Sequence, residues 1–235
     1  MSMLRPAFNY SVKDKNARMN KLLGDAEPDI KRQFRRDDEA LWSFTHIDIA
    51  NELCKVLLSL PGVNSQSVIT DATASVGGNT IPFAVHFAHV NAVERNTSRS
   101  VMLRYNCALF RLINVAIIND DYQSLASMLH QHIVFIDPPW GLDYKQYDKL
   151  RLVLPGTEPI AIEDLISKLT AQYVVVKLPV NYDFEHLLAS TSRSMVWSKT
   201  YSKPNTHTTI ILSSLMPFAS LTSRAPCGDG SKETC

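Results

Sequence analysis

The fold class is most clearly indicated by residues 67–94, SVITDATASVGGNTIPFAVHFAHVNAVE. Apolar residues run together near the two ends of this stretch, which predicts buried strands over residues 67–72 and 89–94. Residues 80–88 between them are typical of a helix, and Pro82 is tolerated because it lies in the first turn. A strand, a helix and a second strand in this order predict a parallel pair joined by a helical crossover.

The alternation of strands and helices continues through most of the chain. We expect helices over residues 96–110, 124–131, 162–170 and 183–190, and strands over residues 114–119, 132–137 and 172–179. Residues 193–202 and 206–215 are strand-like runs separated by a turn, and they predict a closing antiparallel hairpin. This order indicates an α/β fold with a doubly wound, seven-stranded and mostly parallel sheet.

The segment before the alternation has a different character. Residues 1–66 are expected to form a helical N-terminal extension that contributes to the site, and an amphipathic helix is predicted from Phe44 to Leu60, with Thr45 as its N-cap. Residues 31–39, KRQFRRDDE, are first basic and then acidic. This run fits either a solvated helix face or an arm that contacts phosphate groups.

The bulk composition narrows the class of protein. We expect residues 67–215 to form one α/β domain, followed by a flexible tail over residues 216–235. The formal net charge is +1, so binding to nucleic acid requires a local basic patch. The four cysteines show no zinc spacing, and no metal site is expected. Signal-peptide and membrane-spanning patterns are absent from the sequence, so we expect a soluble intracellular protein of the nucleus or cytoplasm.

The loop after the first predicted strand has features of a cofactor site. Ligands of doubly wound sheets bind at the carboxyl ends of the strands, and Gly77 and Gly78 would let the backbone approach a ligand closely. The spacing is neither G-x-G-x-x-G nor that of a phosphate-binding loop with a following lysine. Glu94 ends the second strand, where a carboxylate can accept hydrogen bonds from both hydroxyls of a ribose. We therefore predict S-adenosylmethionine (AdoMet) as cofactor, and the alternative is a glycine-rich turn beside a surface glutamate.

Two acids follow the third predicted strand. Asp121 is placed to accept a hydrogen bond from the exocyclic amine of adenine, and Asp120 competes with it for that role. Either residue can instead be a simple helix cap.

The fourth predicted strand ends in Asp137, Pro138, Pro139 and Trp140, where a substrate would meet the methyl group of the cofactor. An exocyclic amine of a base is a poor nucleophile, and acceptors on its N–H bonds turn its lone pair toward the methyl carbon. The carboxylate and a proline carbonyl can supply these acceptors, and the two prolines fix their direction. The tryptophan ring can stack on the base. The pattern predicts amino-methyl transfer without choosing the base, and the alternative is a rigid turn with a packing tryptophan.

Four stretches together resemble the trimethylguanosine synthase family of RNA cap guanine-N2 methyltransferases. They are LWSFTHIDIANEL (41–53), DATASVGGNTIPFA (71–84), VFIDPPWG (134–141) and VVVKLPVNYDFEHLL (174–188). The second stretch is the most specific, because G-G-N-T is unusual among methyltransferases. The likeness covers roughly residues 41–215. It implies a Rossmann-like class I AdoMet-dependent fold and methyl transfer to N2 of 7-methylguanosine at an RNA 5′ cap, giving 2,7-dimethyl- or 2,2,7-trimethylguanosine.

The resemblance also implies roles for individual residues. Trp140 would stack on 7-methylguanine, Pro138 would orient the N2 amine through its backbone, and Asp137 would complete the catalytic set. Asn181 and Lys177 would contact the substrate. The residues matching the cofactor shell are Ser43, Thr45, Asp71, Thr73, Gly77, Gly78, Asn79, Thr80, Glu94 and Asp121.

This chain departs from the family pattern at several positions. Asp137 replaces the usual serine, which moves the motif toward adenine-N6 enzymes. Val180 stands where an arginine would meet the cap phosphates, so Lys177 or the basic run over residues 31–36 would have to substitute. His46 replaces a proline.

Three hypotheses remain open from the sequence. The first is methylation of the 7-methylguanosine cap, with capped RNA as the partner and no membrane association. The second is methylation of an internal RNA base at adenine-N6 or guanine-N2, which Asp137 favours. The third is a non-catalytic RNA-binding subunit that keeps the fold.

Overall fold

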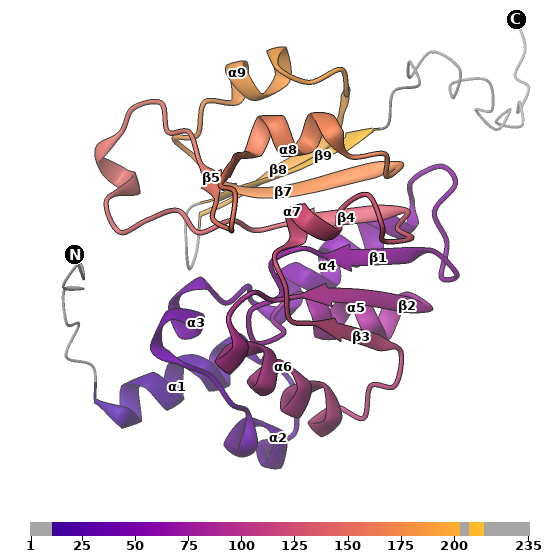
Figure 1. The fold of residues 1–235 in the computed structure, drawn as a ribbon. Coiled ribbons are helices and arrows are strands. Elements are labelled where there is room, and N and C mark those ends of the chain that lie inside the picture. The colour runs from indigo at the N-terminus through magenta and orange to yellow at the C-terminus, as the bar shows by residue number, and fades with distance from the viewer. Residues whose placement is uncertain (1–10, 203–206, 214–235) are drawn as a thin grey trace, which may run out of the picture.

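The centre of the molecule is a seven-stranded sheet in the order β3-β2-β1-β4-β7-β9-β8 (Figure 1). The computed structural model describes residues 11–202 and 207–213, so the expected tail over residues 216–235 lies outside the described residues. The strands are β1 Val68–Asp71, β2 His89–Val93, β3 Val115–Ile118, β4 Ile133–Ile136, β7 Tyr173–Pro179, β8 Met195–Tyr201 and β9 His207–Ser213. The predicted doubly wound sheet is confirmed.

The register of the sheet defines where a ligand can bind. Strands β3, β2, β1, β4 and β7 pair in parallel, and β9 runs antiparallel between β7 and β8. The chain proceeds from β1 to one side through β2 and β3, and then returns to place β4 on the other side of β1. The strand order therefore reverses between β1 and β4, and the carboxyl ends of these strands form the expected ligand-binding edge.

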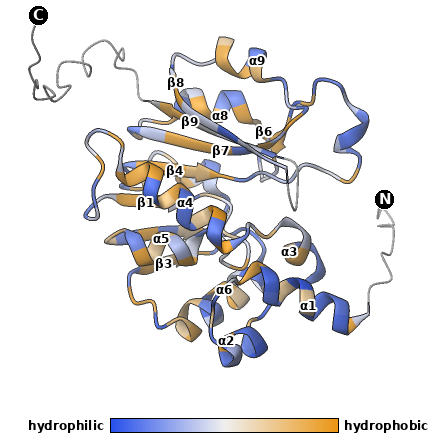
Figure 2. Cartoon of the chain, turned by 180° about the vertical axis from the view of Figure 1, so that it is seen from behind, coloured by the Kyte–Doolittle hydropathy of each residue, from blue (hydrophilic) through white to orange (hydrophobic). Residues whose placement is uncertain are grey.

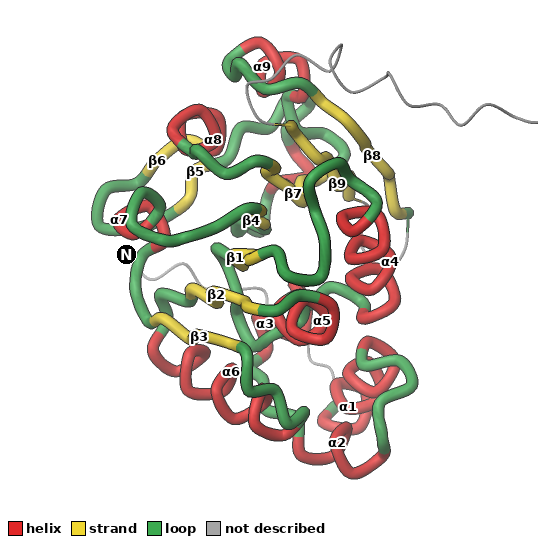
Figure 3. The backbone as a smooth tube through the Cα atoms, turned by 90° about the vertical axis from the view of Figure 1, so that its right-hand side faces the viewer, coloured by secondary structure: helices red, strands yellow, loops and turns green. Residues whose placement is uncertain are grey.

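Helices cover both faces of the sheet. Figure 3 shows the row of strands nearly end-on, with α4 and α5 on one side and α7 and α8 on the other. One core joins α4 and α5 to Ile69 and Phe135, and a second core joins α8 to Val134 and Val176. The central strands are buried on both faces, which explains their continuous apolar sequences. The helices are α4 Ile47–Leu58, α5 Thr80–His86, α6 Thr97–Leu109, α7 Tyr122–Leu125, α8 Ile162–Lys168 and α9 Phe184–Ala189.

The first three helices form what we call the N-terminal lobe: α1 Val12–Leu22, α2 Pro28–Gln33 and α3 Asp38–Ser43. Its apolar core includes Leu23, Leu41 and Phe44, and it packs on Val76 in the loop after β1 and on Ile81 in the first turn of α5. Figure 2 shows the ribbons of α1 and α2 coloured largely as hydrophilic, in contrast to the apolar strands β1 and β4. The lobe is thus anchored to the loop that the sequence assigns to the cofactor.

The helix α4 differs from the lobe in its packing. Its buried residues Leu53, Cys54 and Leu57 share a core with the sheet, although the sequence assigns this helix to an extension over residues 1–66. The domain boundary at residue 66 stays a prediction. Among the described residues, no helix is both long enough and apolar enough to cross a bilayer.

Several local predictions are wrong in detail. The N-cap of α4 is His46 and not Thr45, because the imidazole Nδ1 accepts a hydrogen bond from the backbone N–H of Asp48 at 3.3 Å. The helix expected over residues 124–131 is shorter and begins earlier, at Tyr122. The short strands β5 Val153–Leu154 and β6 Ile160–Ala161 were not expected from the sequence, since two residues give no readable periodicity.

Candidate active site

The predicted site residues gather at the carboxyl ends of the strands. Asp71 is the last residue of β1, Glu94 follows β2, Asp137 follows β4, and Lys177 lies near the end of β7. The N-terminal lobe reaches the same edge through Thr45, which follows α3. The packing of the lobe against the end of β7 brings together Thr45 and Lys177, which are 132 positions apart in the chain.

A chain of hydrogen bonds connects six of these residues. The Thr80 hydroxyl donates to Asp71 Oδ2 at 2.6 Å, and the Thr73 backbone N–H donates to Asp71 Oδ1 at 3.4 Å. The Asp137 backbone N–H donates to Thr73 Oγ1 at 2.8 Å. Lys177 Nζ then donates to Asp137 Oδ2 at 2.6 Å and to Thr45 Oγ1 at 3.0 Å. The network joins β1, α5, β4, β7 and the end of the N-terminal lobe.

Asp71 is the most deeply buried acid of this network, and it accepts hydrogen bonds from both ends of the loop after β1. Its side chain is fully buried, and burial raises its pKa to about 7 although the hydrogen bonds from Thr80 and Thr73 oppose the shift. Both of its oxygens are used to hold the two ends of the loop that follows β1. Asp71 therefore fixes the conformation of the loop by holding Thr73 and Thr80. The sequence predicts a cofactor contact for this residue, and that contact stays a prediction.

The two glycines of the loop allow neighbouring side chains to pack directly against the loop backbone. Gly77 has φ +108°, and a Cβ there would lie 3.1 Å from the Leu103 side chain of α6. A Cβ on Gly78 would lie 3.2 Å from the ring of Phe44. The side-chain Oδ1 of Asn79 is buried and has no hydrogen-bond partner among the described residues. A buried acceptor without a partner costs roughly 1–3 kcal/mol, so this atom is suited to receive a donor from a ligand.

Glu94 is held by backbone groups on both oxygens. Oε2 accepts the backbone N–H of Ser75 at 2.8 Å, and Oε1 accepts that of Asn96 at 2.7 Å. Burial raises its pKa, and the two backbone hydrogen bonds oppose that rise. Each carboxylate oxygen has about two lone-pair sites, so both oxygens keep capacity for further donors. This capacity fits the two hydroxyls of a ribose.

Asp121 is engaged by a neighbouring loop. Its Oδ2 accepts hydrogen bonds from the backbone N–H and the hydroxyl of Thr157, at 2.8 and 3.0 Å, and its Oδ1 pairs with Arg95 Nε at 2.9 Å. Burial raises its pKa, but these hydrogen bonds and the arginine charge outweigh burial, so the pKa is lowered overall. Asp120 is exposed, and its Oδ1 accepts the backbone N–H of Asp121. The adenine-reading role of either acid stays a prediction.

The end of β4 holds an acid paired with a buried lysine. The Lys177 side chain is 5% exposed and that of Asp137 13%, and the ammonium group lies 5.8 Å from the centre of the Trp140 ring. Burial raises the pKa of Asp137, while the charge and hydrogen bond of Lys177 oppose the rise. Asp137 Oδ2 is bound to Lys177, and the structure gives no bond to Asp137 Oδ1 among the described residues. One carboxylate oxygen therefore keeps its capacity to accept further hydrogen bonds.

Trp140 is half-buried and held by aromatic neighbours. Its ring packs edge-on against Tyr144 at a centroid distance of 5.2 Å, and the ring of His207 lies 6.4 Å away. Pro138 is buried and Pro139 is exposed. The indole Nε1 has no hydrogen-bond partner among the described residues.

Asn181 and Ser43 act on the backbone of the site. Asn181 Nδ2 donates to the carbonyls of Tyr144 and Tyr147, at 2.6 and 2.7 Å, and so fixes the loop that carries the neighbour of Trp140. The Ser43 hydroxyl donates to the Glu39 carbonyl within α3, and its own carbonyl accepts from Lys177 at 3.4 Å. Their predicted substrate and cofactor contacts stay predictions.

Sequence reasoning missed two features of this site. The first is the ion pair between Asp137 and Lys177. The sequence indicates it only through one charged residue in, or at the end of, each of two apolar strand-like runs. The second is Tyr144, four residues after Trp140, whose spacing carries no recognisable motif. Among residues 11–202 and 207–213, no group of three or more His, Cys, Asp or Glu side chains is placed to hold a metal ion.

Known proteins share the fold of this chain. A putative RNA methyltransferase from Pyrococcus horikoshii superposes with a TM-score of 0.57, at 16% identity, over 87% of this chain and 98% of the other. A putative methyltransferase from Escherichia coli gives a TM-score of 0.50, at 18% identity, over 71% and 87%. These neighbours identify the sheet as that of the class I methyltransferases.

Sequence comparison is more specific. An uncharacterized protein of Acanthamoeba polyphaga mimivirus is 43% identical over 124 residues, which are 51% of this chain and 48% of that protein. The trimethylguanosine synthase of Schizosaccharomyces pombe is 27% identical over 172 residues, which are 66% of this chain and 70% of the enzyme. The chain thus spans about half the length of the viral relative. The family described as RNA cap guanine-N2 methyltransferase matches residues 66–210, more than half of the chain, and the chain belongs to this family.

Proposed function

We propose that the protein transfers a methyl group from AdoMet to the exocyclic N2 of 7-methylguanosine at the 5′ cap of an RNA. The observation that carries this proposal is the placement of Asp137, Pro138 and Trp140 at the carboxyl end of β4, next to the loop after β1. An acceptor for amine N–H bonds and a ring for base stacking lie together at the edge where the strand order reverses.

The residues around the loop fit AdoMet. Glu94 would hold the ribose hydroxyls with its remaining lone pairs, and the unpartnered Oδ1 of Asn79 would accept a donor such as an ammonium group. Thr73, Gly77 and Gly78 belong to the loop that would enclose this cofactor. When bound, AdoMet supplies an electrophilic methyl group on a sulfonium, so no metal is needed to activate it.

The chain itself would contribute position and orientation. Asp137 Oδ1 would accept an N–H of the base amine, and the carbonyl of Pro138 would accept a second, which directs the nitrogen lone pair. Trp140 would stack on the base, and base–aromatic stacking is worth about 1–3 kcal/mol. Lys177 would act as a positioning residue, because it holds Asp137 in one orientation and favours its ionised form.

A second candidate substrate is a neutral base within the RNA. Lys177 places a positive charge 5.8 Å from the Trp140 ring, and this charge would partly repel a cationic 7-methylguanine stacked there. The carboxylate of Asp137 offsets that repulsion. Adenine-N6 or guanine-N2 methylation at an internal site is therefore the alternative to test beside the cap.

The deciding experiment measures methyl transfer from labelled AdoMet to three versions of one short RNA: with a 7-methylguanosine cap, with an unmethylated cap and without a cap. Label on the methylated cap alone is the expected result. Equal labelling of all three RNAs would move the target to an internal base. The control variant is Trp140→Ala, which should lose transfer but still bind AdoMet in calorimetry, and a loss of AdoMet binding would contradict the division of roles.

A further inference from the structure

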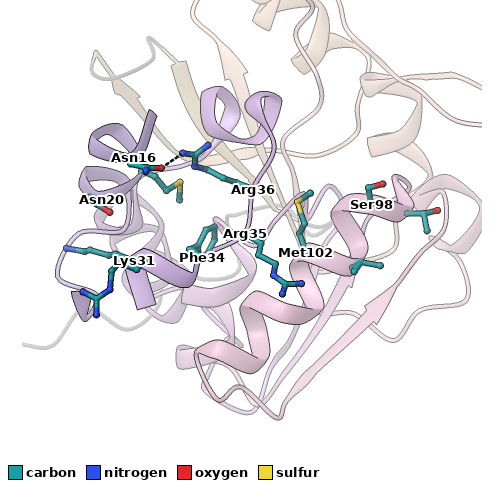
Figure 4. Close-up of a pocket in the computed structure, with 12 residues that line it drawn as sticks. Asn16, Asn20, Lys31, Phe34, Arg35, Arg36, Ser98 and Met102 are labelled. Carbon is teal, nitrogen blue, oxygen red and sulfur yellow. Dashed lines mark hydrogen bonds between the residues drawn. The ribbon is translucent and has the colours of Figure 1, made fainter. Parts of the chain in front are cut away.

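A basic cleft lies outside the site described above, between the N-terminal lobe and α6. It has a volume of about 900 Å³. Its walls are formed by α1, by residues 31–36 and by the first two turns of α6. Figure 4 shows Lys31, Arg35 and Arg36 around this cleft, with Ser98 and Met102 on the opposing helix.

The cleft is positively charged. Four of its twelve lining residues are Lys31, Arg32, Arg35 and Arg36, and none of the twelve is acidic. Arg32 pairs with Asp29, but no ion pair involves Lys31, Arg35 or Arg36 within the described part of the chain. The pKa of Arg36 is lowered because burial disfavours its charge, although Asp38 opposes this effect. A negatively charged ligand would relieve the unbalanced charge.

Two further features suit the cleft to an anion. The 13-residue helix α6 begins there with Thr97 and Ser98, so the positive end of its dipole lies at the cleft. Its first turn carries no acid of its own, although Asp37 and Glu39 pair with Arg99 in that turn. The basic segment is also held rigidly. The fully buried Asn106 bonds the backbone N–H and carbonyl of Arg35, at 2.9 and 2.8 Å, and the Arg35 guanidinium stacks on the Tyr105 ring at 3.6 Å.

We propose that this cleft binds the phosphate backbone of the RNA substrate, a few nucleotides away from the methylated base. The proposal rests on the proposed function for the identity of the RNA. Thr97 lies three residues after Glu94, so the cleft opens near the carboxyl end of β2. Strands β2 and β4 are separated by β1, which is about 10 Å between strand axes. The cleft therefore contacts the body of the RNA and not the base at Trp140.

The test compares two double variants with equal loss of charge. The cleft variant is Lys31→Gln/Arg36→Gln. The matched control is Lys55→Gln/Lys168→Gln, which removes two exposed lysines on α4 and α8, away from the cleft. Glutamine at position 36 can still bond Asn16, the partner of Arg36. Thermal unfolding should show that both variants fold.

The first readout is the binding of an uncapped single-stranded RNA of about 12 nucleotides as salt is varied. Each lost phosphate contact lowers the slope of log affinity against log salt by ~0.7, so the cleft variant should lose about 1.4 of the slope. The control should match the wild-type protein. Equal slopes for the cleft variant and the control, or no salt-dependent RNA binding by the wild-type protein, would overturn the proposal.

The second readout separates the cleft from the chemistry. With capped RNA of the same length, the cleft variant should show a roughly tenfold higher KM at an unchanged kcat. With a cap dinucleotide, which is too short to reach the cleft, its kinetics should equal those of the wild-type protein. A rise in KM for the dinucleotide as well would contradict the separate location. Inactivity of the wild-type protein on every capped substrate would reject the proposed function, while the binding readout would still test the cleft.

Discussion

At the scale of single residues, the chemistry of Asp137 depends on Lys177. A carboxylate as buried as this one is disfavoured in its ionised form, and the ammonium group at 2.6 Å offsets that cost. The same ammonium group bonds Thr45, so it also ties the N-terminal lobe to the end of β4. One lysine thus links the charge of the acceptor to the position of the lobe.

Replacing this lysine tests the link. Lys177→Met leaves Asp137 buried without its partner, so the pKa of Asp137 should rise further. If activity needs the ionised carboxylate, the rising limb of kcat/KM against pH should move to higher pH in the variant. The free energy of unfolding should also fall by about 3 kcal/mol, since one member of a buried pair is removed.

The conservative variant distinguishes positioning from mere stability. Lys177→Arg keeps the charge and should restore the pH profile of the wild-type protein, even where the fit of the larger group is imperfect. A purely structural role for Lys177 predicts less folded protein but an unshifted pH profile in Lys177→Met. That outcome would remove Lys177 from the chemistry.

At the scale of elements, two adjacent glycines join the loop after β1 to different neighbours. Gly78→Ala would press a methyl group toward the Phe44 ring, and overpacking of this kind costs about 1–3 kcal/mol. Gly77→Ala should cost more, because it adds the strain of a positive φ to a close approach to Leu103. Urea unfolding of the two variants measures the order.

The structure offers a specific rescue for one of these glycine variants. Phe44→Leu should recover part of the stability lost by Gly78→Ala, since leucine lacks the ring atom Cε2 and places a smaller side chain beside the new methyl group. Phe44→Leu should not change the stability lost by Gly77→Ala, because a methyl group at position 77 would meet Leu103 and Ile81 instead of Phe44. Equal rescue of both variants would show that the lobe does not restrict Gly78 in the way described.

The elements also show what a sequence can and cannot reveal. Strands such as β4 and β7 were predicted to within a residue or two, because continuous apolar runs bounded by polar residues are local signals. The start of α4 was misplaced because the hydroxyl of Thr45 is a good cap in isolation, yet it serves a lysine 132 positions away. The pair of Asp137 and Lys177 depends on the register of β4 and β7, and no local pattern encodes it.

At the scale of the whole molecule, the protein keeps three buried acids at one edge of its sheet. Burial raises the pKa values of Asp71, Glu94 and Asp137, with Asp71 at about 7. An acid whose pKa is higher in the folded protein than in the unfolded chain takes up protons on folding. The stability gained from this proton uptake is fully present below the pKa of the acid in the unfolded chain, which is ~4. It is lost as the pH rises through the pKa of the acid in the folded protein.

The free energy of unfolding should therefore decrease between about pH 4 and pH 7 through Asp71. Asp71→Asn removes the charge but keeps groups that can bond Thr73 and Thr80. The stability of this variant relative to the wild-type protein should improve by up to a few kcal/mol from about pH 5.5 to about pH 8.5. Chemical unfolding at both pH values measures the change, with Asp164→Asn, an exposed acid on α8, as control. A difference between Asp71→Asn and the wild-type protein that does not vary with pH would mean that Asp71 stays ionised throughout, which would place a compensating charge at the centre of the site.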